Sequence, residues 1–406
     1  MGLLAANRGF RSLFAARFLS SAGDALSLVA LMVHVADSTG QALAVSVLLL
    51  VGDFAPSLFG PLTGAISDRF DLRRVMIGCE LVQAALLVAI AVSLDHLPLV
   101  LVLVGLRALA GQVFLPASRA AVPALVPDRD LPVANSTLGF GTNGAEAVGP
   151  LLAAALIPFA GVRGALLVDA ATFLVSALLL ATLRPIPSAP AAPALLAGAR
   201  QGLRFIWSTP AVRVIALGFC AVVACNGIDD VALVVLAKDT FEAGDAAIGI
   251  LLAGVGIGLF AGYALLSRYA GRLAMAGLLV AGFAISSIGN LLTGLAWAVA
   301  AAVVLQTVRG LGIAAMDVAT NTLVQRLVPA GMLGRVFGTL YGGIGAAAAL
   351  SYVAGGLLLD ATSAPTTFLI AGTAGTLATI AVAVRLARTL RRPSTSVCVG
   401  EESIVD

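Results

Sequence analysis

The chain has 406 residues, of which 60% are hydrophobic and 11% are charged, and its mean hydropathy is +1.05. A soluble globular domain does not need so apolar a composition, whereas a protein that crosses a membrane repeatedly does. The formal net charge of +3 is too small to favour a nucleic-acid partner. The four cysteines form no Cys-x-x-Cys pair, so we expect neither a disulfide framework nor a metal site.

Twelve apolar segments of membrane-spanning length follow one another along the chain. They cover residues 13–36, 42–66, 75–95, 98–119, 134–159, 164–183, 211–237, 246–267, 273–295, 297–324, 336–359 and 365–387. If both termini are cytoplasmic, the outer loops hold only Arg163 and Lys238 as basic residues. Because basic loops resist translocation, this distribution favours a multi-pass protein of the cell membrane with both termini in the cytoplasm.

The two halves of the chain resemble each other at an offset of about 202 residues. Arg107 aligns with Arg309, and the Leu-Val-Pro sequence at 125–127 aligns with the same sequence at 327–329. We therefore expect an all-α integral membrane fold with twelve transmembrane helices in two pseudo-symmetric six-helix bundles. The predicted bundles cover residues 1–184 and 211–390.

A proline-rich stretch separates the two halves. Residues 185–210 are predicted to form a cytoplasmic linker that contains a short amphipathic helix at 199–208, lying on the inner leaflet. Residues 391–406 are predicted to form a cytoplasmic tail.

A tight run of charged residues lies between the second and third predicted spans, and we call residues 64–74 the latch loop. It contains Gly64, Asp68, Arg69, Arg73 and Arg74. The arginines are explained by the preference of basic loops for the cytoplasm, but Asp68 is not. A carboxylate is favoured near the start of a helix, so Asp68 has a conformational role in our interpretation.

Several motifs together resemble the twelve-span drug:proton antiporter branch of the major facilitator superfamily, which includes macrolide and enterobactin exporters. The matching stretches are the N-terminal run 7–24, the latch loop, Leu125-Val126-Pro127, Ala134-Asn135-Ser136, and Gly149-Pro150 in the fifth span. The family loop usually has glycine where this chain has Asp71. The resemblance implies that the latch loop contacts the eleventh span near Arg335.

This resemblance implies a secondary active transporter rather than an enzyme. The expected activity is proton-coupled efflux of amphipathic small molecules, such as drugs, antibiotics or siderophore-like metabolites, by alternating access. An importer or facilitator of a small metabolite on the same fold is the alternative. Apart from substrate, protons and the lipid bilayer, we expect no partner and no cofactor, and we expect a monomer.

Ionisable groups at membrane depth are costly and mark candidate sites. Counting along the spans places Asp24, Asp53, Arg107, Glu146 and Arg309 near mid-membrane, with Asp229 and Asp230 farther out and Glu80 and Asp317 nearer the cytoplasm. Their predicted function is proton coupling or contact with substrate in a cavity between the two bundles.

Each candidate has a structural alternative. Asp24 is our first choice for the proton-coupling carboxyl, but it could instead form a static ion pair with a residue of another helix. Glu146 could face the cavity or neutralise Arg107. Asp53 is more readily a partner for backbone groups freed by Pro56, and adjacent residues Asp229 and Asp230 cannot both face one cavity.

Overall fold

The computed structural model describes residues 2–186, 195–243 and 245–391. In the first half the elements are α1 (Gly2–Ala6), α2 (Arg8–Thr39), α3 (Ala42–Leu49), η1 (Leu50–Phe54), α4 (Ala55–Ser57), α5 (Gly60–Arg69), α6 (Leu72–Val92), α7 (Leu97–Leu125), η2 (Asp128–Asp130) and α8 (Leu131–Ala181).

The amphipathic helix α9 (Leu195–Ser208) leads into the second half. There the elements are α10 (Pro210–Asn226), α11 (Asp229–Val235), η3 (Leu236–Thr240), α12 (Asp245–Tyr269), η4 (Ala270–Arg272), α13 (Met275–Thr293), α14 (Val299–Leu327), η5 (Ala330–Met332), α15 (Leu333–Ala361) and α16 (Ala364–Arg391).

Ten helices among the described residues are long and apolar enough to cross a membrane. Two features explain why this number is lower than the predicted twelve. Helix α8 runs through the predicted spans 134–159 and 164–183 but is broken at Gly161, whose φ of 66° is a conformation that glycine adopts without strain. The predicted span 42–66 is divided among α3, the π-helical η1, α4 and α5. The helices match the predicted ranges, while the count of twelve crossings stays a prediction.

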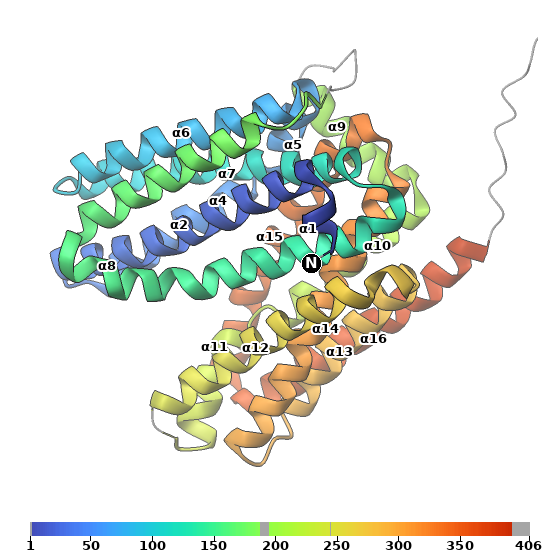
Figure 1. Cartoon of the computed structure of the whole chain (residues 1–406). Coiled ribbons are helices and arrows are strands. Elements are labelled where there is room, and N and C mark those ends of the chain that lie inside the picture. The colour runs from blue at the N-terminus through green and yellow to red at the C-terminus, as the bar shows by residue number, and fades with distance from the viewer. Residues whose placement is uncertain (1, 187–194, 244, 392–406) are drawn as a thin grey trace, which may run out of the picture.

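The two halves form two helical bundles that converge near α5 and α9 and splay apart from there (Figure 1). Arg119 on α7 donates a hydrogen bond of 3.0 Å to the side-chain oxygen of Asn321 on α14, and these residues are 202 positions apart. Residues that are equivalent in the two repeats can contact each other only near the axis that relates the repeats. The internal duplication read from the sequence is therefore visible as contact between equivalent positions.

The halves meet through polar contacts on the side of the molecule that carries the latch loop, which we call the arginine-rich side. The amide of Asn135 donates to Gln325 at 2.7 Å and to Thr322 at 3.0 Å, and Arg326 pairs with Asp128 at 3.0 Å. Each contact joins α8 or η2 to α14. The molecule is closed on the arginine-rich side.

Glycines bring α5 and α15 into backbone contact on the same side. A Cβ atom on Gly64 would lie 2.2 Å from the carbonyl oxygen of Gly334, and one on Gly60 would lie 2.3 Å from that of Gly338. Small residues allow such close approach between helices in a membrane. The glycines at 60 and 64 therefore have a direct structural explanation.

Helix α9 rests against this contact. Gly202 lies against the backbone of Arg335, whose guanidinium donates to the side chain of Gln201 at 2.6 Å. Ile206 is buried, whereas Leu203 and Trp207 are exposed. The predicted apolar face is thus divided between the protein and the surroundings, and the two exposed residues remain available to lipid.

Replacing Gly64 by alanine is expected to destabilise the contact between α5 and α15 by about 1–3 kcal/mol, because the added methyl group overlaps a backbone oxygen. Thermal unfolding of the purified protein measures the loss. Gly78→Ala is the matched control, since nothing lies within 4 Å of a Cβ there. Equal melting temperatures for the two variants would contradict the assigned packing.

Candidate functional site

A cavity of about 360 Å³ lies within the first half, beyond the closed arginine-rich side. Its walls come from α2, α3, η1, α6, α7 and α8, and the polar residues among them are Ser21, Asp24, Gln83, Arg107, Gln112 and Glu146. The remaining lining residues are apolar or glycine. We expected a cavity shared by both bundles, but every residue that lines this one belongs to the first half.

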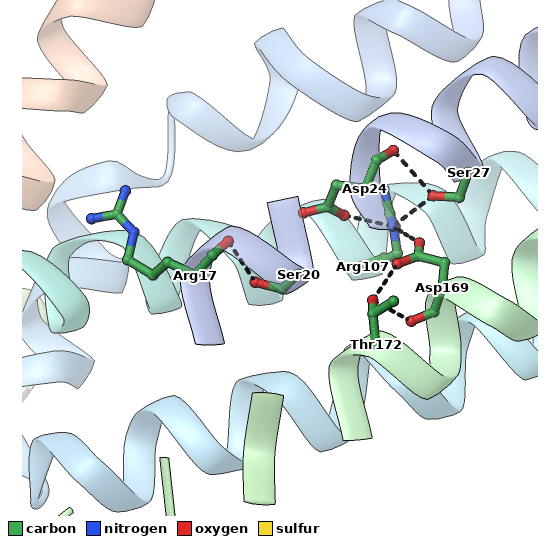
Figure 2. Close-up of polar contacts among 7 residues, drawn as sticks. All are labelled: Arg17, Ser20, Asp24, Ser27, Arg107, Asp169 and Thr172. Carbon is green, nitrogen blue, oxygen red and sulfur yellow. Dashed lines mark hydrogen bonds and ion pairs between the residues drawn. The ribbon is translucent and has the colours of Figure 1, made fainter. Parts of the chain in front are cut away.

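Arg107 on α7 is the centre of a polar cluster at this cavity (Figure 2). Its guanidinium lies 2.8 Å from the carboxylate of Asp24 on α2 and 3.3 Å from that of Asp169 on α8. It also donates to the hydroxyl of Ser27 at 3.3 Å. Arg17 points away from Asp24, so the partner of Asp24 comes from another helix, as the structural alternative proposed.

The two carboxylates differ in exposure. The side chain of Asp24 is 44% exposed toward the cavity, while that of Asp169 is fully buried. Thr172 donates to Asp169 at 3.1 Å. A Cβ on Gly23 would lie 2.1 Å from a carboxylate oxygen of Asp169, so only glycine permits α2 to approach α8 here. Arg107 therefore bridges a cavity-facing acid and a sealed one.

Asp169 is not among the site residues predicted from the sequence. The signal was present, because Asp169 is an acid within the predicted span 164–183 and intramembrane acids are functional candidates by default. Ser27 could not be recognised, since serine is common in transmembrane helices and its contact with Arg107 depends on the packing of two spans.

Glu146 is exposed and lines the cavity. Arg107, which pairs with Asp24 and Asp169, lines the same cavity. Gly149 lies against Ala25, where a Cβ would be 2.2 Å from the Ala25 side chain, and Pro150 is exposed. Asp53 falls on η1, but its side chain lies outside what the structure describes.

The second half contains a corresponding but sealed pair. Arg309 on α14 forms an ion pair with Asp229 on α11, and both side chains are less than 10% exposed. Gln306 accepts a hydrogen bond from Arg309 at 3.1 Å and donates to Thr293 at 3.0 Å. Asp230 is exposed and lies outside this network. The structure thus distinguishes the two adjacent acids, which the sequence could not.

The offset of 202 relates the two clusters residue by residue. Arg107 corresponds to Arg309, Ser27 to Asp229, and Asp24 to Asn226. Asn226 donates to Ser287 at 3.3 Å and accepts from Asn290 at 2.9 Å. The first half therefore has its acid, Asp24, at the cavity surface. The second half has its acid, Asp229, one helical turn later and buried in the interior.

Asp68 of the latch loop lies against the start of α15, as the resemblance implied. Its carboxylate accepts hydrogen bonds from the backbone N–H groups of Gly334 at 2.7 Å and Arg335 at 3.0 Å, and it lies 3.3 Å from the Arg335 guanidinium. These amides belong to the first turn of α15, where backbone donors lack helical partners. Burial raises the pKa of the Asp68 carboxyl to about 6, so it remains mostly ionised at neutral pH.

The other charged residues of the latch loop do not contact α15 in this way. Arg73 donates to the carbonyl oxygen of Ala181, Arg69 lies over the ring of Phe70, and the Arg74 side chain is exposed. Asp71, found where the family usually has glycine, accepts from the Arg74 amide at 3.0 Å and caps the start of α6.

A second polar cluster lies between the halves on the closed side. Asp317 on α14 accepts hydrogen bonds of 3.0 Å from the hydroxyl groups of Tyr263 and Tyr341. Arg119 stacks on the Tyr341 ring at 3.6 Å and donates to Asn321. Among the described residues, no group of three His, Cys, Asp or Glu side chains could hold a metal ion.

The family model of the Major Facilitator Superfamily matches residues 13–237 and 222–403. The chain belongs to the major facilitator superfamily. It is therefore a multi-pass membrane transporter of small molecules.

Relatives span most of the chain. The uncharacterized MFS-type transporter YfiS of Bacillus subtilis (strain 168) is 26% identical over 90% of each chain. The multidrug efflux pump Tap of Mycolicibacterium fortuitum is 28% identical over 88% of this chain and 90% of its own. Macrolide efflux protein A of Streptococcus pyogenes is 29% identical over 30% of this chain and 31% of its own.

The fold is similar to that of a bacterial homologue of the iron transporter ferroportin in an outward-facing state, with a TM-score of 0.80, 17% identity, and coverage of 95% of this chain and 100% of that one. It is also similar to the Escherichia coli fucose:proton symporter FucP, with a TM-score of 0.75, 16% identity, and coverage of 93% and 98%. At these identities the similarity shows the fold alone.

Asp68→Asn is expected to open the arginine-rich side, because it removes the charge that neutralises buried Arg335 at a cost of about 3–5 kcal/mol. A cysteine at Thr322, which is buried in the contact between the halves, reports this opening through its rate of labelling by a thiol reagent. We expect at least a tenfold faster rate once the native cysteines are replaced.

Asp130→Asn is the control for this measurement, since Asp130 is on the same side of the molecule and its partner Arg129 is largely exposed. Equal labelling rates in the Asp68→Asn and Asp130→Asn proteins would show that Asp68 does not hold the halves together.

Proposed function

We propose that this protein exports amphipathic small molecules, cations above all, in exchange for protons. The observation that carries the proposal is the Asp24–Arg107–Asp169 cluster, which holds one cavity-facing and one sealed carboxylate on a single arginine. The efflux activity named for two relatives, Tap and macrolide efflux protein A, supports the direction of transport.

The orientation of the cavity follows from the positive-inside rule. The closed side carries the latch loop and the other arginine-rich connections, so we place it, with both termini, in the cytoplasm of a cell that holds the protein in its cell membrane. The cavity then faces outward. This is the state from which an exporter releases its substrate and takes up protons.

Asp24 is the group best placed to take up a proton. Its side chain is partly exposed to the cavity, and its ion pair with Arg107 is the interaction that protonation would break. Arg107 would keep Asp169 as a partner, so the buried arginine is not left uncompensated. The cluster can thus change its protonation state without leaving the buried charge of Arg107 unpaired.

The lining of the cavity favours a cationic amphipathic substrate. Asp24 and Glu146 contribute two acidic groups and Arg107 one basic group, while Ala25, Leu28 and Leu31 supply apolar surface. A cation could take the place of the proton as the partner of Asp24. Competition for one carboxylate is a simple physical basis for exchange.

The test is ethidium accumulation by proteoliposomes with an acidic lumen. We expect the wild type to accumulate this amphipathic cation, and Asp24→Asn to fall to the level seen without a pH gradient, because asparagine cannot exchange a proton. Binding of ethidium to the purified variant should weaken and lose its pH dependence, because the proton and the cation no longer compete for a carboxylate at this position.

Asp95→Asn is the matched control, since Asp95 is 80% exposed and pairs with exposed Arg163 at the far end of the bundle. Full gradient-driven accumulation by Asp24→Asn would refute the role of Asp24. Equal transport by the wild type with and without the gradient would instead favour a facilitator.

A second expectation concerns the substrate. Glu146→Gln removes one of the two acids that line the cavity, so we expect weaker binding of ethidium by about 1 kcal/mol, within the range of single charged contacts. Fluorescence titration of the purified protein measures the affinity. An uncharged amphipathic ligand should bind both proteins equally, and an equal loss for both ligands would argue for a steric effect.

A further inference from the structure

Glu80 on α6 is a buried acid outside the Arg107 cluster. Its side chain is fully buried, and neither of its carboxylate oxygens has a hydrogen-bond partner among the described residues. The other carboxylates that lie buried in the described chain, Asp68, Asp169 and Asp229, each have a cationic partner. Glu80 has none there.

The absence of a partner fixes the protonation state. An ionised carboxylate in a low-dielectric interior, with no cation beside it, is far more costly than the neutral acid. Glu80 is therefore protonated when the cavity faces outward. The proton cannot be displaced by Arg107, because that arginine is engaged with Asp24 and Asp169.

The protonated Glu80 carboxyl has a neighbour that can accept its hydrogen bond. Ser176 on α8 lies beside the Glu80 carboxyl, and its hydroxyl also lacks a hydrogen-bond partner among the described residues. A protonated carboxyl has an O–H donor and the serine hydroxyl can accept it. The hydroxyl could also donate to an ionised carboxylate, but one neutral donor does not offset a buried negative charge, so the pair is most stable when Glu80 carries its proton.

Glu80 also lies within electrostatic range of the acids that meet Arg107. Asp24 on α2 and Asp169 on α8 both act on its carboxyl, and Gln83, one turn along α6, lines the cavity. Three carboxyls therefore share one arginine in the interior of the first half. Ionising all three would leave two uncompensated negative charges, so the group must hold at least one proton.

We propose that Glu80 is a second proton-carrying residue of the transport cycle, with Ser176 as the acceptor that holds its acid hydrogen. This inference rests on the proposed proton exchange. When Asp24 takes up a proton from the open side, one negative charge near Glu80 is lost, and Glu80 can then give its own proton to cytoplasmic water once the molecule opens inward. One proton enters as one leaves, so the charge of the interior stays constant.

The protonation state is tested without transport. Infrared spectra of the purified protein at neutral pH should contain the carbonyl band of a buried carboxylic acid, which Glu80→Gln removes and Ser176→Ala shifts. Glutamine has the size of the neutral acid, so the variant should fold, and its elution on size exclusion checks this. Asp95→Asn should leave the band unchanged, and a band that survives intact in Glu80→Gln would overturn the inference.

The role in transport is tested by counting protons moved per ethidium in the proteoliposomes. We expect Glu80→Gln to bind ethidium as the wild type does but to lose the proton movement that accompanies ethidium, since the carboxyl that releases the proton is missing. A wild type that couples normally, with Glu80→Gln at the same ratio, would overturn this inference alone. A wild type that moves no protons with ethidium would overturn the proposed function and any transport role of Glu80 with it.

Discussion

The first half of the molecule is organised by the need to neutralise acids around a single arginine at membrane depth. Arg107 reaches Asp24, Ser27 and Asp169 from a third helix, and Gly23 provides the space in which two of these helices approach. Such an arrangement gains little stability, because the cost of desolvating the charges offsets much of their attraction. The arrangement gives Arg107 two possible ion-pair partners. If one carboxylate is neutralised, the other still pairs with the arginine.

In the second half of the molecule the equivalent arginine, Arg309, is paired with one acid, Asp229. Asparagine replaces the cavity-facing acid at 226, and the acid appears one turn later at Asp229, where it forms a sealed pair with Arg309. Gln306, Asn290 and Asn226 then satisfy the surrounding polar groups. The charge of Arg309 is paired with Asp229, although its Nε atom has no hydrogen-bond partner among the described residues. In our proposal the Arg107 cluster changes partners during transport, whereas the sealed Arg309 pair is a fixed support.

Much of the architecture was predictable because the bilayer imposes length, hydropathy and charge rules on the sequence. The helices follow the predicted ranges, and the offset of 202 appears as the contact between Arg119 and Asn321. The exceptions have local causes: Gly161 breaks α8 between the two predicted spans that it covers, and the segment around η1 departs from regular α-helix.

The candidate site was predicted only in part. Asp24, Arg107 and Glu146 were recognisable because charge is scarce in apolar spans, and Asp169 carried the same signal. Which acid pairs with Arg107, and which of Asp229 and Asp230 faces inward, depends on helix rotation and neighbouring side chains. A single sequence does not contain that information. The location of the cavity within one half, rather than between both, likewise depends on which side of the molecule is closed.

The closed side is built so that it can open. Gly60 and Gly64 meet Gly334 and Gly338 through backbone atoms, so the helices separate without withdrawing interlocked side chains. Such a contact allows close packing of α5 and α15 but does little to hold the two helices in one relative position. Asp68 favours the closed position, because its carboxylate accepts hydrogen bonds from two N–H groups of α15 and also pairs with the charge of Arg335. Because one carboxylate supplies all three interactions, we expect them to form and break together, so that the closed side would switch between two positions rather than loosen gradually.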